Sequence, residues 1–206
     1  NKGGNMQENF YEESAKIQEE TSAARKYYIA KVFMVISYVL AVIWGIFCLT
    51  LIIDLKNILL SLIFSLIPLA LFIVSGIILG KFKDKFYVDY DYTFVSGSIR
   101  FSKVIKNINK KYIINFDTSD IEKIGLYGSE IYEKYSKMPD IKTKILTSNS
   151  TPSEGKDFYY IVANVGGDKY VFIVECSELF IVNILKFTNR TVLDQEILNK
   201  KKNKNN

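Results

Sequence analysis

Two long stretches without a charged residue, Val32 to Ile53 and Ile58 to Leu79, restrict the possible folds of this chain more than any other feature. Each holds 22 residues, and a helix of that length, rising about 1.5 Å per residue, matches the roughly 30 Å apolar core of a bilayer. Helices of water-soluble proteins rarely continue so far without a charge. Because only four residues separate the stretches, we predict a transmembrane helical hairpin and not two buried helices of a soluble core.

The cations around the two stretches predict the orientation of this hairpin. Three lie before the first stretch and three after the second: Arg25, Lys26 and Lys31, then Lys81, Lys83 and Lys85. Flanks rich in lysine and arginine stay in the cytoplasm, so both termini are expected there, with the chain in the cell (plasma) membrane. The first stretch is too long for the apolar region of a signal peptide, and a second stretch follows it, so the hairpin is expected to be retained.

Small residues recur at helical spacing within the predicted spans. Such residues let two helices approach closely, either within one hairpin or between two copies in a homo-oligomer, and the sequence leaves both alternatives open. Trp44 lies in the middle of its span, which favours packing against the other helix over anchoring at the membrane interface. The small residues are Ser37, Ala41 and Gly45 on the first span and Gly76 and Gly80 on the second.

The segment before the hairpin, residues 1–27, mixes charges at short intervals and contains few apolar residues. Good helix formers run from Glu12 to Lys26, so we expect a cytoplasmic tail that is disordered or loosely helical. The first methionine is Met6, and the sequence leaves open whether the native chain starts there, so we predict no role for residues 1–5.

Charge and residue usage restrict the chemistry of the chain. Lysine and arginine number 27 against 22 aspartates and glutamates, and the whole excess of +5 lies in residues 81–206. A basic domain beside anionic lipid is attracted to it, although a solvated surface of mixed sign explains this composition equally well. No basic stretch interleaved with aromatic residues suggests nucleic-acid binding.

The chain contains no histidine, which excludes serine-histidine triads, cysteine-histidine pairs and histidine-ligated zinc. The two cysteines, Cys48 in the first span and Cys176 in a predicted strand, cannot pair, as suits a reducing cytoplasm. We therefore predict no catalytic, cofactor-binding or metal-binding residues, no cofactor and no enzymatic activity.

After Lys85 the hydrophobic period changes to two, which is typical of strands with one buried face. We predict a cytoplasmic domain over residues 86–198, followed by a basic disordered tail over residues 199–206. The predicted hairpin, over residues 28–85, precedes this domain. The expected strands are 86–94, 99–105, 112–116 and 121–127, forming an antiparallel meander, and then 142–147, 158–165 and 170–176. Short helices are expected at 129–135 and at 179–187, the latter with Ser177 as N-cap.

Seven strands followed by a helix resemble the pleckstrin-homology (PH) barrel. Tyr90-Asp91-Tyr92, the turn at Gly97, Asp120-Ile121-Glu122-Lys123-Ile124 and Tyr127-Gly128-Ser129 are similar to an uncharacterised bacterial family, which has a two-helix transmembrane hairpin before a cytoplasmic PH-like domain. The resemblance implies an α+β membrane protein with a PH-like antiparallel β-barrel and a C-terminal helix. It implies no catalytic residues.

The densest group of cations in the predicted domain flanks a turn between two strands. These residues are expected to contact an anionic lipid or an acidic protein segment, unless they are only a solvated loop. The group consists of Lys103, Lys106, Lys110 and Lys111.

These patterns favour a membrane-anchored, non-enzymatic interaction module, which presents a PH-like domain to protein or anionic lipid partners at the inner membrane surface. The alternative is an accessory subunit of a larger membrane complex for transport or the envelope, which would use the small-residue stripes laterally. An enzyme is a distant third hypothesis.

Overall fold

The computed structural model describes residues 10–51, 58–188 and 192–194, and these residues form two compact units. One unit is helical and comprises Glu19 to Tyr87. The other combines residues 10–18 with the described residues from Val88 onward. The expected connection at residues 54–57, the candidate start at Met6 and the basic tail at residues 199–206 lie outside the described residues.

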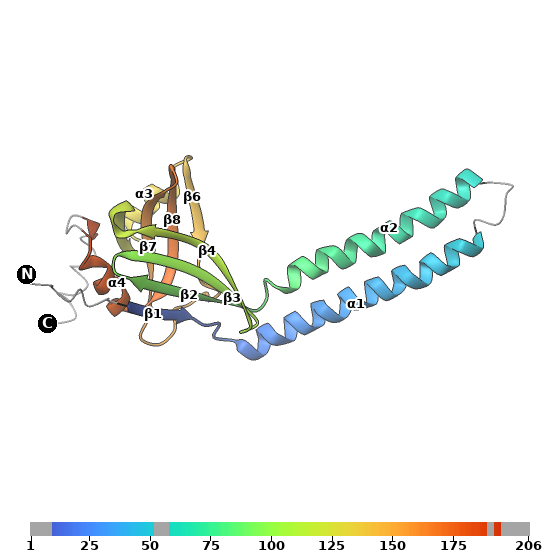
Figure 1. Ribbon diagram of the computed structural model, residues 1–206, viewed down its shortest axis with the longest axis horizontal. Helices are drawn as coiled ribbons and strands as arrows, with labels where there is room; N and C mark the ends of the chain where they lie inside the picture. Colours follow the sequence, from blue (N-terminus) through green and yellow to red (C-terminus); the bar gives the residue numbers. More distant parts are fainter. Residues whose placement is uncertain (1–9, 52–57, 189–191, 195–206) are drawn as a thin grey trace, which may run out of the picture. The chain divides into compact units, whose positions relative to one another are not determined.

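The helical unit consists of α1 (Glu20–Leu51) and α2 (Ile58–Lys83), which pack against each other along their lengths (Figure 1). Both helices are long and apolar enough to cross a membrane, over Glu20–Leu49 and Leu62–Lys83. Only 11% of the most apolar window of each helix is buried, whereas a core helix of a soluble protein would be mostly buried. The remaining apolar surface therefore needs an apolar solvent, as lipid provides.

The β unit contains two four-stranded sheets (Figure 1). The first is antiparallel throughout, in the order β1 (Phe10–Ala15), β2 (Val88–Val95), β3 (Ser98–Ile105) and β4 (Asn109–Asp117). The second has the order β5 (Ile121–Leu126), β7 (Asp157–Val165), β8 (Asp168–Cys176) and β6 (Ile141–Ile145). In this second sheet β6 runs parallel to β8 and the other pairs are antiparallel.

Apolar side chains from the inner faces of both sheets form one core. Tyr92 and Phe101 of the first sheet are fully buried together with Phe172 of the second, and the rings of Phe116 and Phe172 stack with centroids 5.1 Å apart. Helix α4 (Glu178–Leu185) adds Phe180 and other apolar residues to this core. As predicted, Ser177 caps α4, because its side chain accepts a hydrogen bond from the Phe180 N–H.

Three expectations about the sheets need correction. Residues 10–15 are not a disordered or helical tail, because β1 pairs with the edge of β2 in register from Phe10–Val95 to Ala15–Tyr90. The strand expected at 121–127 does not extend the first meander, because a 3₁₀ turn at Thr118–Asp120 leads the chain into the second sheet, where β5 pairs with β7. Eight strands, one of them in a parallel pair, form two sheets that do not close into the expected seven-stranded antiparallel barrel.

Candidate functional site

The three glycines among the predicted small residues of the spans lie at the contact between α1 and α2. A Cβ on Gly76 would lie 2.8 Å from Cε1 of Tyr38, so a larger residue at this position would require the Tyr38 ring to move. Corresponding Cβ positions lie 3.4 Å from Met34 Sδ at Gly80 and 3.9 Å from Leu69 Cδ1 at Gly45. These contacts support packing within one hairpin, while a homo-oligomer stays a prediction.

The other two predicted packing residues differ in what they contact. Ala41 is buried, as expected for a residue facing the opposite helix. The Ser37 hydroxyl instead donates to the Phe33 carbonyl one turn earlier in its own helix, at 2.9 Å. Ser37 therefore satisfies its polar group within α1, as a serine in an apolar solvent must.

The polar groups in the middle of the hairpin are satisfied internally. Nε1 of Trp44 donates to the Ser65 carbonyl at 3.0 Å, and Sγ of Cys48 lies 3.4 Å from the same oxygen. The Ser65 hydroxyl donates to the Leu62 carbonyl at 3.1 Å. Trp44 thus contacts the other helix, as its position in the span predicted.

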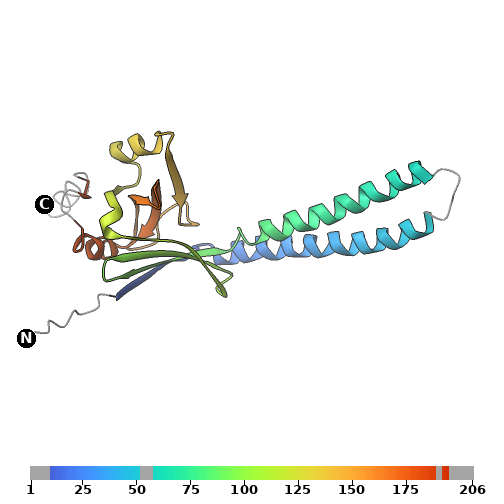
Figure 2. The ribbon, with the colours of Figure 1, turned by 45° about the horizontal axis from the view of Figure 1, so that its top comes forward.

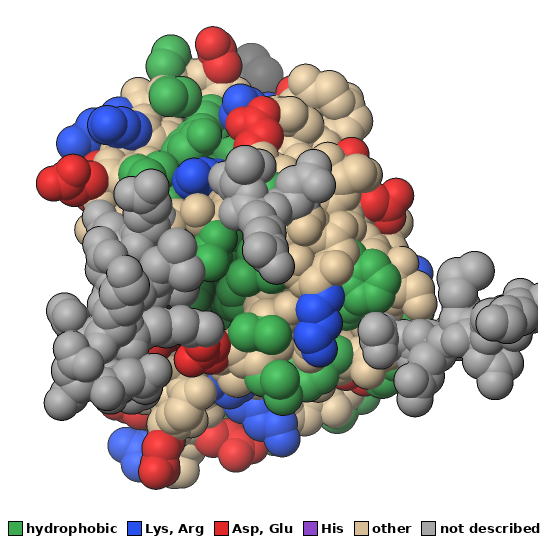
Figure 3. All heavy atoms as spheres, turned by 90° about the vertical axis from the view of Figure 1, so that its left-hand side faces the viewer, with side chains coloured by type: hydrophobic (Ala, Val, Ile, Leu, Met, Phe, Trp, Pro, Cys, Tyr) green, Lys and Arg blue, Asp and Glu red, His purple; other side chains and the backbone are tan. Residues whose placement is uncertain are grey.

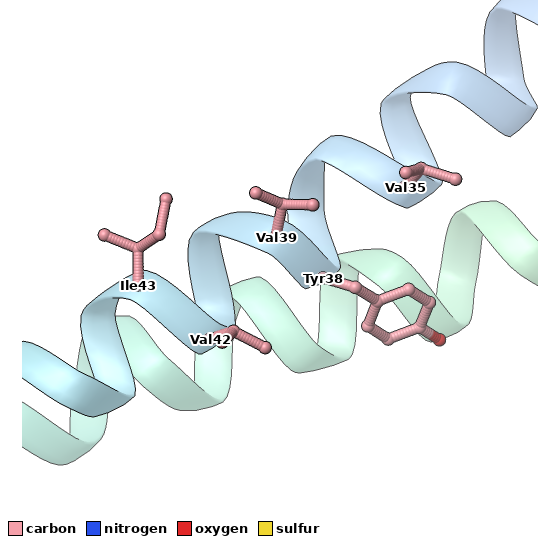
Figure 4. A pocket seen from close by; sticks show the side chains of 5 residues that line it. All are labelled: Val35, Tyr38, Val39, Val42 and Ile43. Carbon is pink, nitrogen blue, oxygen red and sulfur yellow. The ribbon is translucent and has the colours of Figure 1, made fainter.

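The outer surface of α1 carries an apolar hollow of about 330 Å³. Figure 4 shows its five lining residues, with the Tyr38 ring reaching across α2 toward the position of Gly76. The lining exposes no polar atoms, so its chemistry suits a lipid acyl chain and offers no group for catalysis. It is lined by Val35, Tyr38, Val39, Val42 and Ile43.

The four lysines predicted to contact lipid or a partner do not share one face of the first sheet. Lys103 and Lys111 lie opposite each other on β3 and β4, whereas Lys110, the neighbour of Lys111 along β4, points to the other face. The Lys110 ammonium binds Asp91 at 2.8 Å and Glu12 at 3.1 Å. Both bonds raise the pKa of Lys110, and the bond to Asp91 contributes most. Lys106 lies in the turn with a φ of 53°.

The structure therefore divides this lysine group, and one member is already paired with two carboxylates. Figure 3 shows a different face of the molecule, on which basic and acidic side chains are interspersed among apolar ones and neither sign dominates the coloured residues. Lipid contact by these four lysines stays a prediction.

A buried carboxylate, Glu175 on β8, organises the loop between β6 and β7. Oε1 accepts hydrogen bonds from the Ser153 N–H at 2.9 Å and from its hydroxyl at 2.5 Å. Oε2 accepts from Thr147 Oγ1 at 2.5 Å and from Asn149 Nδ2 at 2.8 Å. Burial alone would raise the pKa of Glu175, but the bonds from Ser153, Thr147 and Asn149 lower it below its ordinary value, so the group is a carboxylate at neutral pH.

The same loop holds the segment that leads from β1 into α1. The Asn149 side chain accepts from the Gln18 N–H at 2.9 Å and donates to the Lys16 carbonyl at 2.8 Å. Nε2 of Gln18 donates to the Thr151 carbonyl at 2.8 Å. Residues 16–18 are thereby fixed to the β unit just before the helical unit begins.

A second set of contacts fixes β1 itself. Lys156, at the end of the same loop, donates to the Ser14 carbonyl at 2.5 Å and pairs with Glu13 at 3.2 Å. The Glu13 carboxylate also accepts from the N–H and the hydroxyl of Ser177, each at 2.9 Å. The N-terminal strand is therefore held by the loop and by the start of α4 as well as by β2.

The outer face of the second sheet is covered by α3 (Glu130–Ser136). Tyr132 of α3 packs on Tyr160, and the Tyr160 hydroxyl donates to the Asp194 carboxylate at 3.0 Å. Ser129, the N-cap of α3, lies 3.4 Å from the same carboxylate. Burial, and then the bond to Asp194, raises the pKa of Tyr160, so its hydroxyl stays a donor.

Between α3 and the β6–β7 loop, this face contains a second hollow of about 200 Å³, which we call the outer hollow. Its walls are aromatic and aliphatic, and the loop supplies its polar groups. Two of those polar residues, Thr147 and Asn149, also donate hydrogen bonds to the Glu175 carboxylate. The lining residues are Tyr127, Ile145, Thr147, Asn149, Ser150, Phe158 and Ile173.

Residues 7–194 match a protein family described as Bacterial PH-like domain (DUF6106). The chain belongs to this family. The match includes both β1 and the helical hairpin, so both are parts of the bacterial PH-like family's sequence pattern. Neither the curated proteins nor the solved structures that were compared gave a match.

The side chains that organise the β6–β7 loop of this bacterial PH-like domain were not among the residues predicted from the sequence. The signal was a charged residue, Glu175, in the otherwise apolar part of β8 from Val171 to Cys176. A buried charge in such a strand requires several donors, which the polar loop at 147–153 supplies. Among the described residues, no group of three or more histidine, cysteine, aspartate or glutamate side chains could hold a metal ion.

Proposed function

We propose that the protein is a membrane-anchored, non-enzymatic interaction module, which holds a PH-like domain at the cytoplasmic surface of the plasma membrane. The observation that carries this proposal is the position of the helical hairpin within the chain. The hairpin is inserted between β1 and β2, two strands that pair with each other as far as Ala15 and Tyr90.

This insertion attaches the domain at two neighbouring strands. Four residues, 16–19, separate β1 from α1, and four others, 84–87, separate α2 from β2. Four extended residues span at most about 14 Å, so both links are short. The loop contacts of Gln18 and Lys16 shorten the free part of the first link further. A domain tethered in this way meets membrane-bound targets at a raised effective concentration without any new contact.

The polar side chains of the domain support a non-catalytic role. Glu175 and Glu13 are each occupied by several donors of the fold, and the chain has no histidine to act as a base. The acid, base and nucleophile that most hydrolytic mechanisms combine are thus not assembled at these sites.

The alternative, an accessory subunit of a larger membrane complex, would need a lateral surface on the helices. The glycines that would favour lateral association already pack against the other helix of the same hairpin; these are Gly45, Gly76 and Gly80. We therefore favour the module.

Site-specific photo-crosslinking in cells separates the two functions. A photoreactive amino acid is placed at Ile108, which is 73% exposed between β3 and β4, or at Val42, which is 64% exposed on α1. The module predicts protein or lipid-headgroup adducts from position 108 and only lipid adducts from position 42. A stoichiometric adduct with an integral membrane protein from position 42 would instead establish the subunit.

A further inference from the structure

Strand β6 presents an unpaired edge. It is the last strand of its sheet, and no described strand pairs with its other side (Figure 2). The Leu146 N–H donates to the Ile173 carbonyl of β8 at 2.8 Å. In a parallel ladder the backbone groups of successive residues point alternately toward and away from the partner strand. The N–H and C=O groups of Lys142 and Lys144 therefore also point toward β8. Thr143 and Ile145 therefore direct their N–H and C=O groups away from the sheet.

The two sides of this edge differ in chemistry. On one side the Ile145 side chain, which is 62% exposed, forms the rim of the outer hollow. On the other side lie Lys142 and Lys144, with ammonium groups 5.8 and 5.2 Å from the centre of the Tyr170 ring. Lys142 is paired with Asp168 at 2.6 Å, whereas Lys144 has no ion pair with any residue that the structure describes. An added strand would thus meet an apolar hollow on one face and a cation on the other.

This charge pattern selects among possible occupants. A second copy of β6 would bring lysines beside lysines, and lysine on an edge strand is a known means of preventing such pairing. A strand that alternates apolar and acidic residues would place one set in the hollow and the other beside Lys144. Backbone hydrogen bonds would supply affinity and the alternating side chains specificity.

We propose that β6 binds an extended segment of a partner protein, as an added strand with an apolar side chain in the outer hollow and acidic side chains beside Lys144. This inference rests on the proposed module function and names the class of its partner. Lys142, already paired with Asp168, plays the smaller part in recognition.

The test uses the full chain in phosphatidylcholine nanodiscs and a fluorescein-labelled nine-residue peptide of alternating glutamate and valine. Fluorescence polarisation should detect binding, and the same peptide with lysine in place of glutamate should bind at least about fivefold more weakly. Lys144→Glu should weaken binding of the glutamate peptide by about fivefold. Lys134→Glu, the same charge change at an exposed position of α3, should leave binding unchanged.

Two further variants test the backbone edge and the hollow. Thr143→Pro removes an outward N–H without removing a bond to β8, and should weaken binding by about tenfold. Ile145→Ser alters a mostly exposed side chain at the rim of the hollow, so the fold should tolerate it, and it too should weaken binding.

Absence of binding at about 1 mM glutamate peptide would overturn the proposal. Equal binding of both peptides, or binding unchanged by both Lys144→Glu and Ile145→Ser, would overturn it as well. None of these results affects the module function, which the crosslinking pattern of positions 108 and 42, both outside β6, tests separately.

Discussion

Replacement of Glu175 by glutamine tests whether one buried carboxylate holds the β6–β7 loop in place. The substitution keeps the shape of the side chain but turns one acceptor oxygen into an NH₂ donor. Each oxygen of Glu175 accepts one hydrogen bond from a hydroxyl and one from an N–H group. A hydroxyl can turn and accept from the new NH₂, but the N–H donor, of Ser153 or of Asn149, loses its acceptor. Placed at Oε2, the new donor would also face the amide donor of Asn149, 2.8 Å away.

The expected cost follows from this lost bond. A hydrogen bond to a charged group contributes about 1.5–3 kcal/mol, so Glu175→Gln should destabilise the closed loop by about that amount. Opening of the loop should then be roughly 10- to 150-fold more frequent. Because the loop holds residues 16–18, the same increase should extend to the Gln18 amide, which donates to Asn149.

Hydrogen-exchange mass spectrometry of the full chain in nanodiscs measures this opening directly. Peptides covering residues 147–153 and 16–18 should exchange faster in Glu175→Gln, while peptides from α2 should not change. Glu154→Gln makes the same chemical change at an exposed position of the same loop and should exchange like the wild type. Exchange of Glu175→Gln within about threefold of the wild type would refute the argument that this carboxylate organises the loop.

Three other predictions concern the same contacts. Gly76→Leu should force the helices apart and lower the thermal stability of the hairpin in detergent, whereas Gly45→Ala, whose added Cβ makes only ordinary contact, should not. Asn149→Ala should speed amide exchange at Gln18 while leaving peptides from β2 and β3 unchanged, because it removes the acceptor of that N–H. Since the folded state lowers the pKa of Glu175 below its ordinary 4.5, the carboxylate stabilises the loop above pH 4.5, and this contribution is lost as the pH falls through the folded pKa. Acidification should therefore speed loop opening, measured by exchange corrected for its intrinsic pH dependence, in the wild type and not in Glu175→Gln.

The sequence predicted the elements whose signal is local. Uncharged runs predicted both helices, and alternation of apolar residues predicted β2, β3, β7 and β8 close to their observed bounds. The Gly166-Gly167 turn between β7 and β8 has positive φ at both glycines, the backbone conformation that tight hairpin turns require.

Pairings between distant segments could not be predicted in the same way. Strand β1 has the mixed sequence Phe-Tyr-Glu-Glu-Ser-Ala, and its partner β2 lies beyond the whole hairpin in the chain. Its charges suggested a solvated tail, but Glu13 is satisfied by Lys156 and Ser177, which are far away in sequence. Non-local partners of this kind determine the pairing, and no local pattern records them.

The candidate sites show the same limitation. Density of lysine along the chain suggested one basic patch, but neighbours in a strand face opposite sides, which separates Lys110 from Lys111. The edge of β6 was not recognisable because its exposure depends on the parallel pairing with β8. Small residues in the spans were recognisable because helical spacing is itself a local pattern, and in the structure Gly76 lies beside Tyr38 and Gly80 beside Met34.

The central claim, that lipid surrounds the hairpin and the PH-like domain lies on the cytoplasmic side, is tested most directly by cysteine accessibility in cells. Both native cysteines are buried, so Lys134→Cys on α3 provides an exposed thiol for a membrane-impermeant maleimide. The account predicts that this thiol, in the membrane fraction, is labelled only after the membrane is permeabilised. Labelling in intact cells, or recovery of the chain in the soluble fraction, would contradict it.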